Sequence, residues 1–368
     1  MSTASASPAA VALKGSVLVL IQFDVCEELR LDRLQQAVSA RTLEQPSLKH
    51  SPAYVRYERP PVVEPIEPLV LESGERLGGE IKYYDYGVVS VIFQLPFSGS
   101  WESLVHLASR WVWDVDFAAR AEPIVRQKLE RAKAAMIKPY SRWLSEDYFI
   151  FHVREATGNP SAADLTRNFG LQIAQVVRGD RLLLSDGESR EVLQSQVSYY
   201  AGDVSVIGWN AAFLYDTTAG AETAIQLLEY ANSQLLEFRH YDELLTGILD
   251  RVYDLLAEKK GFFAGWGLAR SATNLHTVLL DVAELTERAD NAIKFLSDMF
   301  AARLYKLAAG KVGVPDYKDL VARKLRTAEE LYQDMVAQFN HSRAFLLEAT
   351  VVLILLIELF FLFRGKPF

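Results

Sequence analysis

The stretch that most restricts how this chain folds is the run of nineteen residues from 345 to 363, "FLLEATVVLILLIELFFLF". All are apolar except Glu348, Thr350 and Glu358, and fifteen are Leu, Ile, Val or Phe. A helix of this length extends roughly 28 Å, which nearly matches the hydrocarbon core of a bilayer. A soluble helix normally carries a polar stripe, and this segment has none. The sequence therefore predicts a transmembrane helix over residues 344–364, and the alternative is a buried core helix of a soluble domain.

The two glutamates do not prevent insertion into a membrane. Each large apolar residue contributes roughly −0.3 to −0.6 kcal/mol to insertion, whereas a charged residue costs about 3 kcal/mol at mid-bilayer and less near an interface. Glu348 lies in the first turn of the span, where snorkelling to headgroups and contact with another subunit fit its position equally. Glu358 lies ~8 Å from the far end, which favours a subunit contact. Both residues are predicted membrane and oligomer contacts.

The composition of the remaining chain is that of a largely water-soluble protein. Charged residues make up 23% of the sequence and the net charge is −8, so no basic excess indicates nucleic-acid binding. The single cysteine, Cys26, excludes an intramolecular disulfide and is predicted to be a core residue. Residues 1–15 have no basic segment before their apolar part and resemble neither a secretory signal nor a transit peptide. We expect them to form a disordered lead-in.

The first structured segments predict a strand followed by a helix. "SVLVLIQF" (16–23) is an apolar, β-branched run of strand length. Residues 27–40, "EELRLDRLQQAVSA", place their apolar residues on one helical face. Together the two segments predict a βα unit.

A proline-rich connection and a hairpin follow. Residues 46–68 hold six of the thirteen prolines and are predicted to lack regular structure. Residues 80–95, "EIKYYDYGVVSVIFQL", predict two strands joined at Gly87 as a hairpin. The next segment, "SWESLVHLASRWVW", has the spacing of a helix.

The middle of the chain predicts short strands between helical segments, and from residue 219 onward the three- and four-residue spacing predicts almost only helix. The strand-like segments are residues 147–155, 181–184 and 203–209. The predicted fold class is therefore α+β, with a mixed α/β domain over residues 16–218 and a helical region over 219–343.

The last hundred residues predict an antiparallel helical hairpin that continues into the membrane. Two apolar stripes cover residues 282–304 and 321–339. Gly310 is predicted to end the first helix and Pro315 to open the second. No proline or glycine interrupts residues 316–364, so one helix of about 48 residues is expected there. Residues 365–368 form a short tail.

The C-terminal sequence resembles a known family. "HSRAFLLEATVVLILLIELFFLF" is similar to the C-terminal signature of the DUF155 family (the Rmd1, Sif2, Sif3 and RMND1-like proteins), in which Leu-Glu introduces a hydrophobic anchor and another Glu follows ten residues later. Leu347, Glu348 and Glu358 match that pattern.

Two upstream stretches carry the same resemblance. "ARSATNLHTVLLDVAEL" looks like the family's Asn-Leu and Leu-Leu-Asp stretch through Asn274, Leu275, Leu280 and Asp281. "KYYDYGVVSVIF" is similar to its aromatic-rich strand, with the Tyr-Gly pair at Tyr86 and Gly87. The resemblance implies a membrane-anchored protein of a family associated with translation support at a mitochondrial inner membrane and with higher-order assembly. It implies no catalytic residue.

The residues themselves carry no recognisable catalytic motif. The histidines have no metal-ligand spacing, and the sequence contains none of the glycine-rich phosphate motifs or nucleophile elbows. "HVRE" (152–155) and "HYDE" (240–243) combine histidine with acids, but their predicted strand and helix contexts favour structural roles. "SDGES" (185–189) is interpreted as a turn followed by an acidic helix start rather than a phosphate loop. We therefore expect no cofactor, no metal site and no enzyme activity.

The predicted function is a membrane-anchored scaffold or tether that associates with itself and organises a soluble protein partner at the bilayer. The alternative is an enzyme or ligand-binding α+β domain held near the membrane by the tail. With no export signal in the sequence, we expect the large domain on the cytoplasmic side of a bacterial inner membrane, with a mitochondrial inner membrane as the alternative. The predicted partners are the lipid bilayer, further copies of the chain and that soluble protein.

Overall fold

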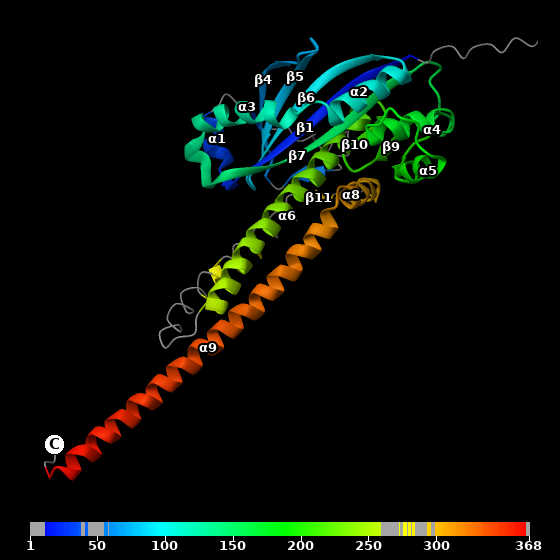
Figure 1. The fold of residues 1–368 in the computed structure, drawn as a ribbon. Coiled ribbons are helices and arrows are strands. Elements are labelled where there is room, and N and C mark those ends of the chain that lie inside the picture. Colours follow the sequence, from blue (N-terminus) through cyan, green and yellow to red (C-terminus); the bar gives the residue numbers. More distant parts are fainter. Residues whose placement is uncertain are drawn as a thin grey trace, which may run out of the picture. The chain divides into compact units, whose positions relative to one another are not determined.

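A computed structural model describes residues 12–37, 41–42, 55–57, 59–258, 272, 275–277, 279–280, 282–283, 293–295 and 299–365 (Figure 1). Contacts divide the chain into two units. The first, which we call the sheet unit, comprises Met1–His240 and Thr286–Tyr317. The second, which we call the helical unit, comprises Tyr241–Leu285 and Lys318–Phe368. The N-terminal sheet and C-terminal helices of the predicted α+β class are both present.

The sheet unit is built on a nine-stranded sheet in the order β2-β4-β5-β6-β1-β7-β10-β9-β8. Neighbouring strands are antiparallel except for β7 and β10, which are parallel. The strands are β1 (Leu13–Leu29), β2 (Arg41–Thr42), β4 (Val62–Val70), β5 (Arg76–Tyr83), β6 (Val88–Gly99), β7 (Met136–Ala156), β8 (Gln196–Val197), β9 (Val204–Ile207) and β10 (Ala211–Tyr215). The short strands β3 (Val55–Tyr57) and β11 (Ile293–Phe295) form a separate pair.

The first strand is longer than the sequence predicts. β1 continues to Leu29, and the following helix α1 covers only Leu31–Ala37, so the helix predicted over 27–40 begins four residues late. Cys26 and Leu29 pair with residues of β7, and both side chains are fully buried. Cross-strand pairing thus overrides the helical character of the Glu-rich segment.

The proline-rich stretch 46–68 is not irregular throughout, because β4 begins at Val62 and contains Pro65 and Pro68. β4 lies near the edge of the sheet, where it pairs with β5 along most of its length and with β2 only at Val62 and Val63. Proline is tolerated at such an edge because its missing N–H is not needed for a ladder on the open side.

The predicted hairpin is confirmed, with β5 and β6 antiparallel and joined through Gly87. The helix after it is also confirmed as α2 (Trp101–Trp113), which Ser100 caps through its side chain. The strand predicted over 181–184 is wrong: Leu182 and Leu183 are largely exposed and lie in no strand. Their apolar run has no cross-strand partner, and a short run alone does not specify a strand.

One face of the sheet carries the hydrophobic core. Alternate residues of β1, including Val17, Val19 and Ile21, pack with the helices α2, α3 (Phe117–Arg131) and α4 (Ala162–Arg178). Figure 1 shows α2 and α3 on this side of the sheet. Helix α5 (Asp186–Gln194) begins directly after its cap Ser185, which confirms the acidic helix start predicted at "SDGES". The turn predicted before it is wrong, because Asp186 and Gly187 already belong to the helix.

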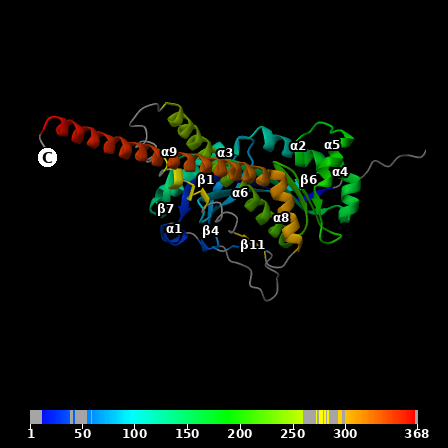
Figure 2. The ribbon, with the colours of Figure 1, turned by 90° about the horizontal axis from the view of Figure 1, so that it is seen from below.

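The other face of the sheet is covered by the first half of helix α6 (Thr218–Glu258), which is seen from below in Figure 2. This half of the helix buries polar residues as well as apolar ones. Glu229, Asn232, Ser233, Gln234 and Glu237 are each at most 3% exposed. A polar seam therefore runs between α6 and the sheet.

The predicted antiparallel hairpin over 282–339 is not what the described residues show. Residues 293–295 form strand β11, and Gly310 lies inside helix α8 (Met299–Val312) instead of ending it. Gly313, with φ 94°, takes the left-handed conformation before α9 (Val314–Phe363), and Pro315 is close to the start of that helix, as predicted. Leu285, Ala289 and Leu296 of the first stripe lie outside the described residues.

In the helical unit the apolar stripe of α9 packs against the second half of α6. Ala328 and Met335 of α9 form a buried cluster with Ile248, Leu249 and Val252 of α6. Beside that cluster the ammonium group of Lys324 contacts Asp242 and Thr246 of α6. The stripe therefore has a helical partner, but it is α6 and not the segment that directly precedes α9.

Candidate functional site

A cavity of about 970 Å³ opens on the α6 side of the sheet and is our candidate functional site. We call it the sheet cavity. Residues of several strands and of the first turns of α6 form its walls. These residues are Gly15, Ser16 and Leu18 of β1, Pro68 of β4, Arg76, Gly78, Gly79, Glu80 and Lys82 of β5, Ile92, Gln94 and Pro96 of β6, His152 and Arg154 of β7, and Thr218, Glu222, Ile225 and Gln226 of α6.

The strand register brings these residues together. Ser16 of β1 lies opposite Pro96 of β6 on one side and His152 of β7 on the other, so the three form a row across the sheet. Alternating side chains of a strand face opposite sides, which places Lys82, Glu80 and Gly78 of β5 on the cavity face. A Cβ atom built on Gly78 would meet nothing within 4 Å, so the absence of a side chain there leaves space in the cavity.

The roof of the cavity comes from one face of α6. Thr218, Glu222, Ile225 and Gln226 follow one another at intervals of four, three and one, which places them on one side of the helix. Thr217 caps this helix by accepting a hydrogen bond from the Gly220 N–H at 3.1 Å. The positive end of the α6 dipole therefore adjoins the cavity.

The cavity contains two kinds of cationic side chain. Lys82 is buried in the floor, where its ammonium group lies 2.8 Å from Glu229 and 3.8 Å from Glu80. Arg76 and Arg154 are exposed, and neither has an ion-pair partner within the part of the chain that the structure describes. The charge of the lysine is compensated inside the protein, whereas the two guanidinium groups remain available to an anion.

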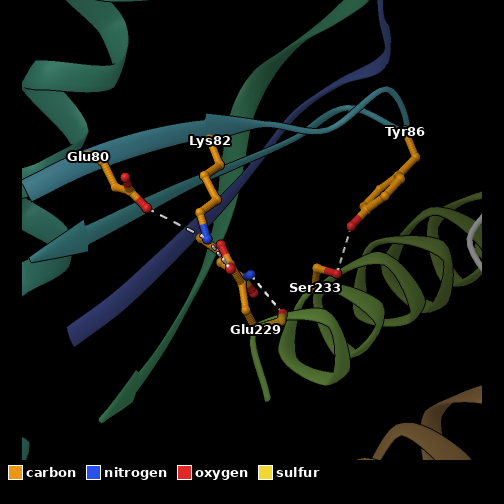
Figure 3. Close-up of polar contacts among 6 residues, drawn as sticks. Glu80, Lys82, Tyr86, Glu229 and Ser233 are labelled. Carbon is orange, nitrogen blue, oxygen red and sulfur yellow. Dashed lines mark hydrogen bonds and ion pairs between the residues drawn. The ribbon is translucent and has the colours of Figure 1, made fainter. Parts of the chain in front are cut away.

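Figure 3 shows how the polar seam holds α6 against the strands. Glu229 receives a hydrogen bond from Lys82 through its carboxylate and from the Gln22 side chain through its backbone carbonyl, at 2.8 Å and 2.9 Å. One helical turn further along α6, the hydroxyls of Tyr86 and Ser233 lie 2.9 Å apart. These contacts fix the register of α6 over the sheet, and thus the position of the cavity roof.

A second polar cluster lies at the far end of the same seam. The Asp24 carboxylate, 1% exposed, lies 2.9 Å from Nδ1 of His240, and the ring of Tyr140 stacks on that histidine with 4.3 Å between the ring centroids. Burial raises the pKa of Asp24, although the contact with His240 opposes this effect. Burial also raises the pKa of the Cys26 thiol to about 12, so this buried side chain is a neutral core residue, as predicted.

The two histidine motifs of the sequence lie at these two places. In "HVRE", His152 and Arg154 line the sheet cavity, and Nε2 of His152 lies 2.9 Å from the backbone carbonyl of Asp216. Burial lowers the pKa of His152, which keeps its ring neutral. In "HYDE", His240 pairs with Asp24. Within the described ranges no group of three or more His, Cys, Asp or Glu side chains could hold a metal ion.

Sequence reasoning did not identify the other cavity residues. Ser16, Arg76 and Gln94 stand in no motif, Lys82 is only the first residue of the family-like strand, and a polar residue at every second position of a strand is also typical of a solvated face. The one available signal was the polar residues that interrupt the apolar helix pattern of α6 after residue 228. That signal becomes meaningful only once the helix is known to lie on the sheet.

The residues of the family signature are scattered over both units. Tyr86 is buried in the seam, and Gly87 has φ 92°, where an added Cβ atom would lie only 1.8 Å from the Cys26 carbonyl oxygen. Leu275 is buried in the cluster of the helical unit, whereas Leu280 is 58% exposed. Asn274 and Asp281 lie outside the described residues.

The apolar end of α9 is exposed along its length. Leu347, Glu348 and Glu358 are all exposed, as are most of the large apolar residues around them. By length and composition, α9 is the one helix among the described residues that is able to cross a membrane. The helix runs unbroken from Val314 to Phe363, close to the predicted length.

The fold and the cavity define an α+β protein with a cavity of about 970 Å³ on one sheet face and a C-terminal helix of membrane-spanning length. Residues 14–222 match the family model described as "Uncharacterized protein MJ0711, N-terminal domain". Because this match covers more than half of the chain, the protein belongs to that family. The matched range contains the whole nine-stranded sheet except the first residue of β1, and the α6 residues Thr218 and Glu222 of the cavity roof.

One curated relative is similar to part of the chain. It is "Uncharacterized protein MJ0711" of Methanocaldococcus jannaschii, 21% identical over 169 residues, which are 46% of this chain and 52% of the relative. The match therefore spans about half the length of the relative. No solved structure matches the chain. These comparisons give no specific support to the DUF155 family that the sequence motifs resemble.

Proposed function

We propose that the protein is a membrane-anchored, non-enzymatic scaffold that associates with itself and organises a soluble protein at the bilayer. The observation that carries this proposal is the exposed apolar end of α9, where Val351, Leu355 and Phe360 are each more than half exposed. A contiguous apolar surface of this size is unfavourable in water and is expected to be covered by lipid or protein. A bilayer covers all sides of such a helix at once.

The polar groups of the sheet unit support a structural role. The buried Lys82 is paired with Glu229, and the buried Asp24 is paired with His240. His152 is held by a backbone carbonyl and kept neutral by burial. The internal contacts of these groups hold α6 in a fixed position over the sheet. A fixed helix position is what a rigid tether requires.

The ligand-binding alternative is favoured by a different observation, the sheet cavity. A pocket of this volume falls within the range of about 300–1,000 Å³ that small-molecule sites occupy. A scaffold that also binds a small molecule would combine both roles. The two roles are separable, because the cavity lies wholly in the sheet unit and the apolar end of α9 in the helical unit.

The anchor is tested by fractionating cells that express the full chain, a chain ending at Asn340, and the full-length variant Ile354→Lys. We expect the full chain to stay in membranes after washing with high salt and alkaline carbonate, and the shortened chain to be soluble. Ile354→Lys places a charge near the middle of the span at a cost of about 3 kcal/mol and should reduce membrane insertion. A full chain that is soluble without detergent as a defined oligomer would show that protein, not lipid, covers α9.

The orientation is proposed together with the anchor: residues 1–340 lie on the cytoplasmic side. Protease added to intact cells should leave the sheet unit uncut, whereas protease added to inverted vesicles should digest it. Digestion in intact cells would reverse the proposed orientation.

A further inference from the structure

We infer that the sheet cavity is a binding site for a phosphate ester of about nucleotide size. This inference develops the ligand-binding alternative and does not depend on the membrane anchor. It rests on the charge, the polarity and the size of the cavity, and each of these restricts the ligand.

Two cationic side chains of the cavity are available to an anion. Arg76 and Arg154 stand on β5 and β7, and with β6 and β1 between them their backbones are roughly 14 Å apart at the usual strand spacing. Two guanidinium groups on opposite walls point to a phosphate, which arginine binds through paired N–H donors.

The polar side chains of the cavity floor favour a ligand that carries hydroxyl groups. Ser16 is only 7% exposed, lines the cavity, and its hydroxyl has no hydrogen-bond partner in the described part of the chain. The hydroxyl of this cavity residue can exchange a hydrogen bond with a ligand oxygen. Glu80 and Glu222 offer carboxylates that accept hydrogen bonds from ligand hydroxyls or amines.

The volume and the apolar patches exclude a bare anion. Inorganic phosphate would fill only a small part of about 970 Å³. Leu18, Ile92 and Ile225 form apolar surface within the same cavity, against which a flat ring could pack. An anionic end, hydroxyls and an apolar ring occur together in a mononucleotide, so that is the ligand class that fits the walls best.

Gly78 provides a way to close the cavity with little effect on the fold. A side chain at this position would enter open space, and the backbone there does not have a positive φ. Gly78→Phe should therefore fill the site. Gly202→Phe is the matched control, because a Cβ on exposed Gly202 also meets nothing within 4 Å and this residue lies outside the cavity.

The charge is tested by a second pair of variants. Arg154→Gln removes a cavity guanidinium, and Arg33→Gln removes an exposed one on helix α1. Both replacements keep a long polar side chain on the surface. A difference between them therefore measures position and not net charge.

The experiment uses the full chain in nanodiscs of phosphatidylcholine and measures binding by titration calorimetry of AMP, adenosine, inorganic phosphate and short-chain phosphatidate. We expect saturable binding of AMP, at least tenfold weaker binding of adenosine, and at least tenfold loss of AMP affinity in Gly78→Phe and Arg154→Gln. Gly202→Phe and Arg33→Gln should bind as the wild type does.

Two further outcomes show whether the phosphate ester is a nucleotide or a lipid headgroup, and whether the cavity binds a phosphate ester at all. Binding of phosphatidate in place of AMP, with the same loss in Gly78→Phe, would identify a lipid headgroup as the phosphate ester and retain the site. If no probe binds, or if binding survives in a correctly folded Gly78→Phe variant, the cavity is not a phosphate-ester site. Circular dichroism of each variant establishes that it is folded.

Discussion

The buried ion pair between Lys82 and Glu229 allows a quantitative test of how α6 is held on the sheet. The two charged atoms are 2.8 Å apart, and the side chains are 8% and 0% exposed. Lys82→Met would leave the Glu229 carboxylate in the interior, with one of its oxygens already lacking a hydrogen-bond partner. Removing one member of a buried pair costs about 3–5 kcal/mol, because the remaining charge is uncompensated.

The expected loss is measurable by thermal unfolding of the full chain in detergent. For a unit of this size, 1 kcal/mol shifts Tm by about 2–4 °C, so Lys82→Met should lower it by roughly 6–20 °C. The fluorescence of the buried Trp101 and Trp111 reports unfolding of the sheet unit. Lys14→Met is the matched control: its pair with Glu155 is 3.5 Å long and mostly exposed, and such pairs contribute about 0–1 kcal/mol.

A double variant separates the effect of losing the ion pair from the effect of leaving one charge buried without a partner. Lys82→Met combined with Glu229→Leu replaces both charges by apolar groups of similar length, and it should recover much of the stability that the single variant loses. A Lys82→Met protein within about 1 °C of the Lys14→Met control would refute the assignment of a buried, compensated pair. A double variant no more stable than Lys82→Met would show that the loss comes from packing alone.

Three further outcomes are expected. Burial raises the pKa of Asp24, so the protonated carboxyl stabilises the folded state below about pH 4, and this contribution is lost as the pH rises through the raised pKa. In Asp24→Asn the free energy of unfolding, measured with denaturant, should therefore vary less with pH over that range. An unchanged dependence on pH would contradict the assignment. Gly87→Ala should lower the free energy of unfolding in urea by more than about 2 kcal/mol, because φ is 92° and the new Cβ would meet the Cys26 carbonyl. The control Gly202→Ala should change this free energy by no more than about 0.5 kcal/mol. Glu358→Leu should favour membrane insertion and weaken any oligomer that forms in nanodiscs. An oligomer whose subunit number and stability are unchanged would identify the glutamate as an interfacial side chain.

Local chemistry made several elements predictable. The apolar run before Arg364 and the absence of helix breakers after Asp316 predicted the long helix α9. The Gly87 turn between two β-rich runs predicted the β5–β6 hairpin, because glycine takes the positive φ that such a turn needs. Each of these signals lies within a few residues of the structure it specifies.

Other elements depended on partners that are distant in the sequence. Residues 27–29 belong to a predicted helix, but β7 provides a strand partner more than a hundred residues away, and β1 therefore extends to Leu29. The stripe of α9 correctly predicted a helical partner, but the predicted partner, the stripe over 282–304, was wrong, since any apolar helix face would suit. Proximity along the chain suggested the preceding segment, and the structure instead uses α6.

The sequence by itself determined the segments of the chain: a β-rich first part, a helical second part and a final helix apolar enough for a membrane. Only the tertiary structure decided where the polar residues meet. Arg76, Ser16, Arg154 and Glu222 come from three strands and a helix, and no spacing in the sequence relates them. Strand register and the placement of α6 relate them, and both are set by long-range hydrogen bonds and packing that sequence periodicity does not encode.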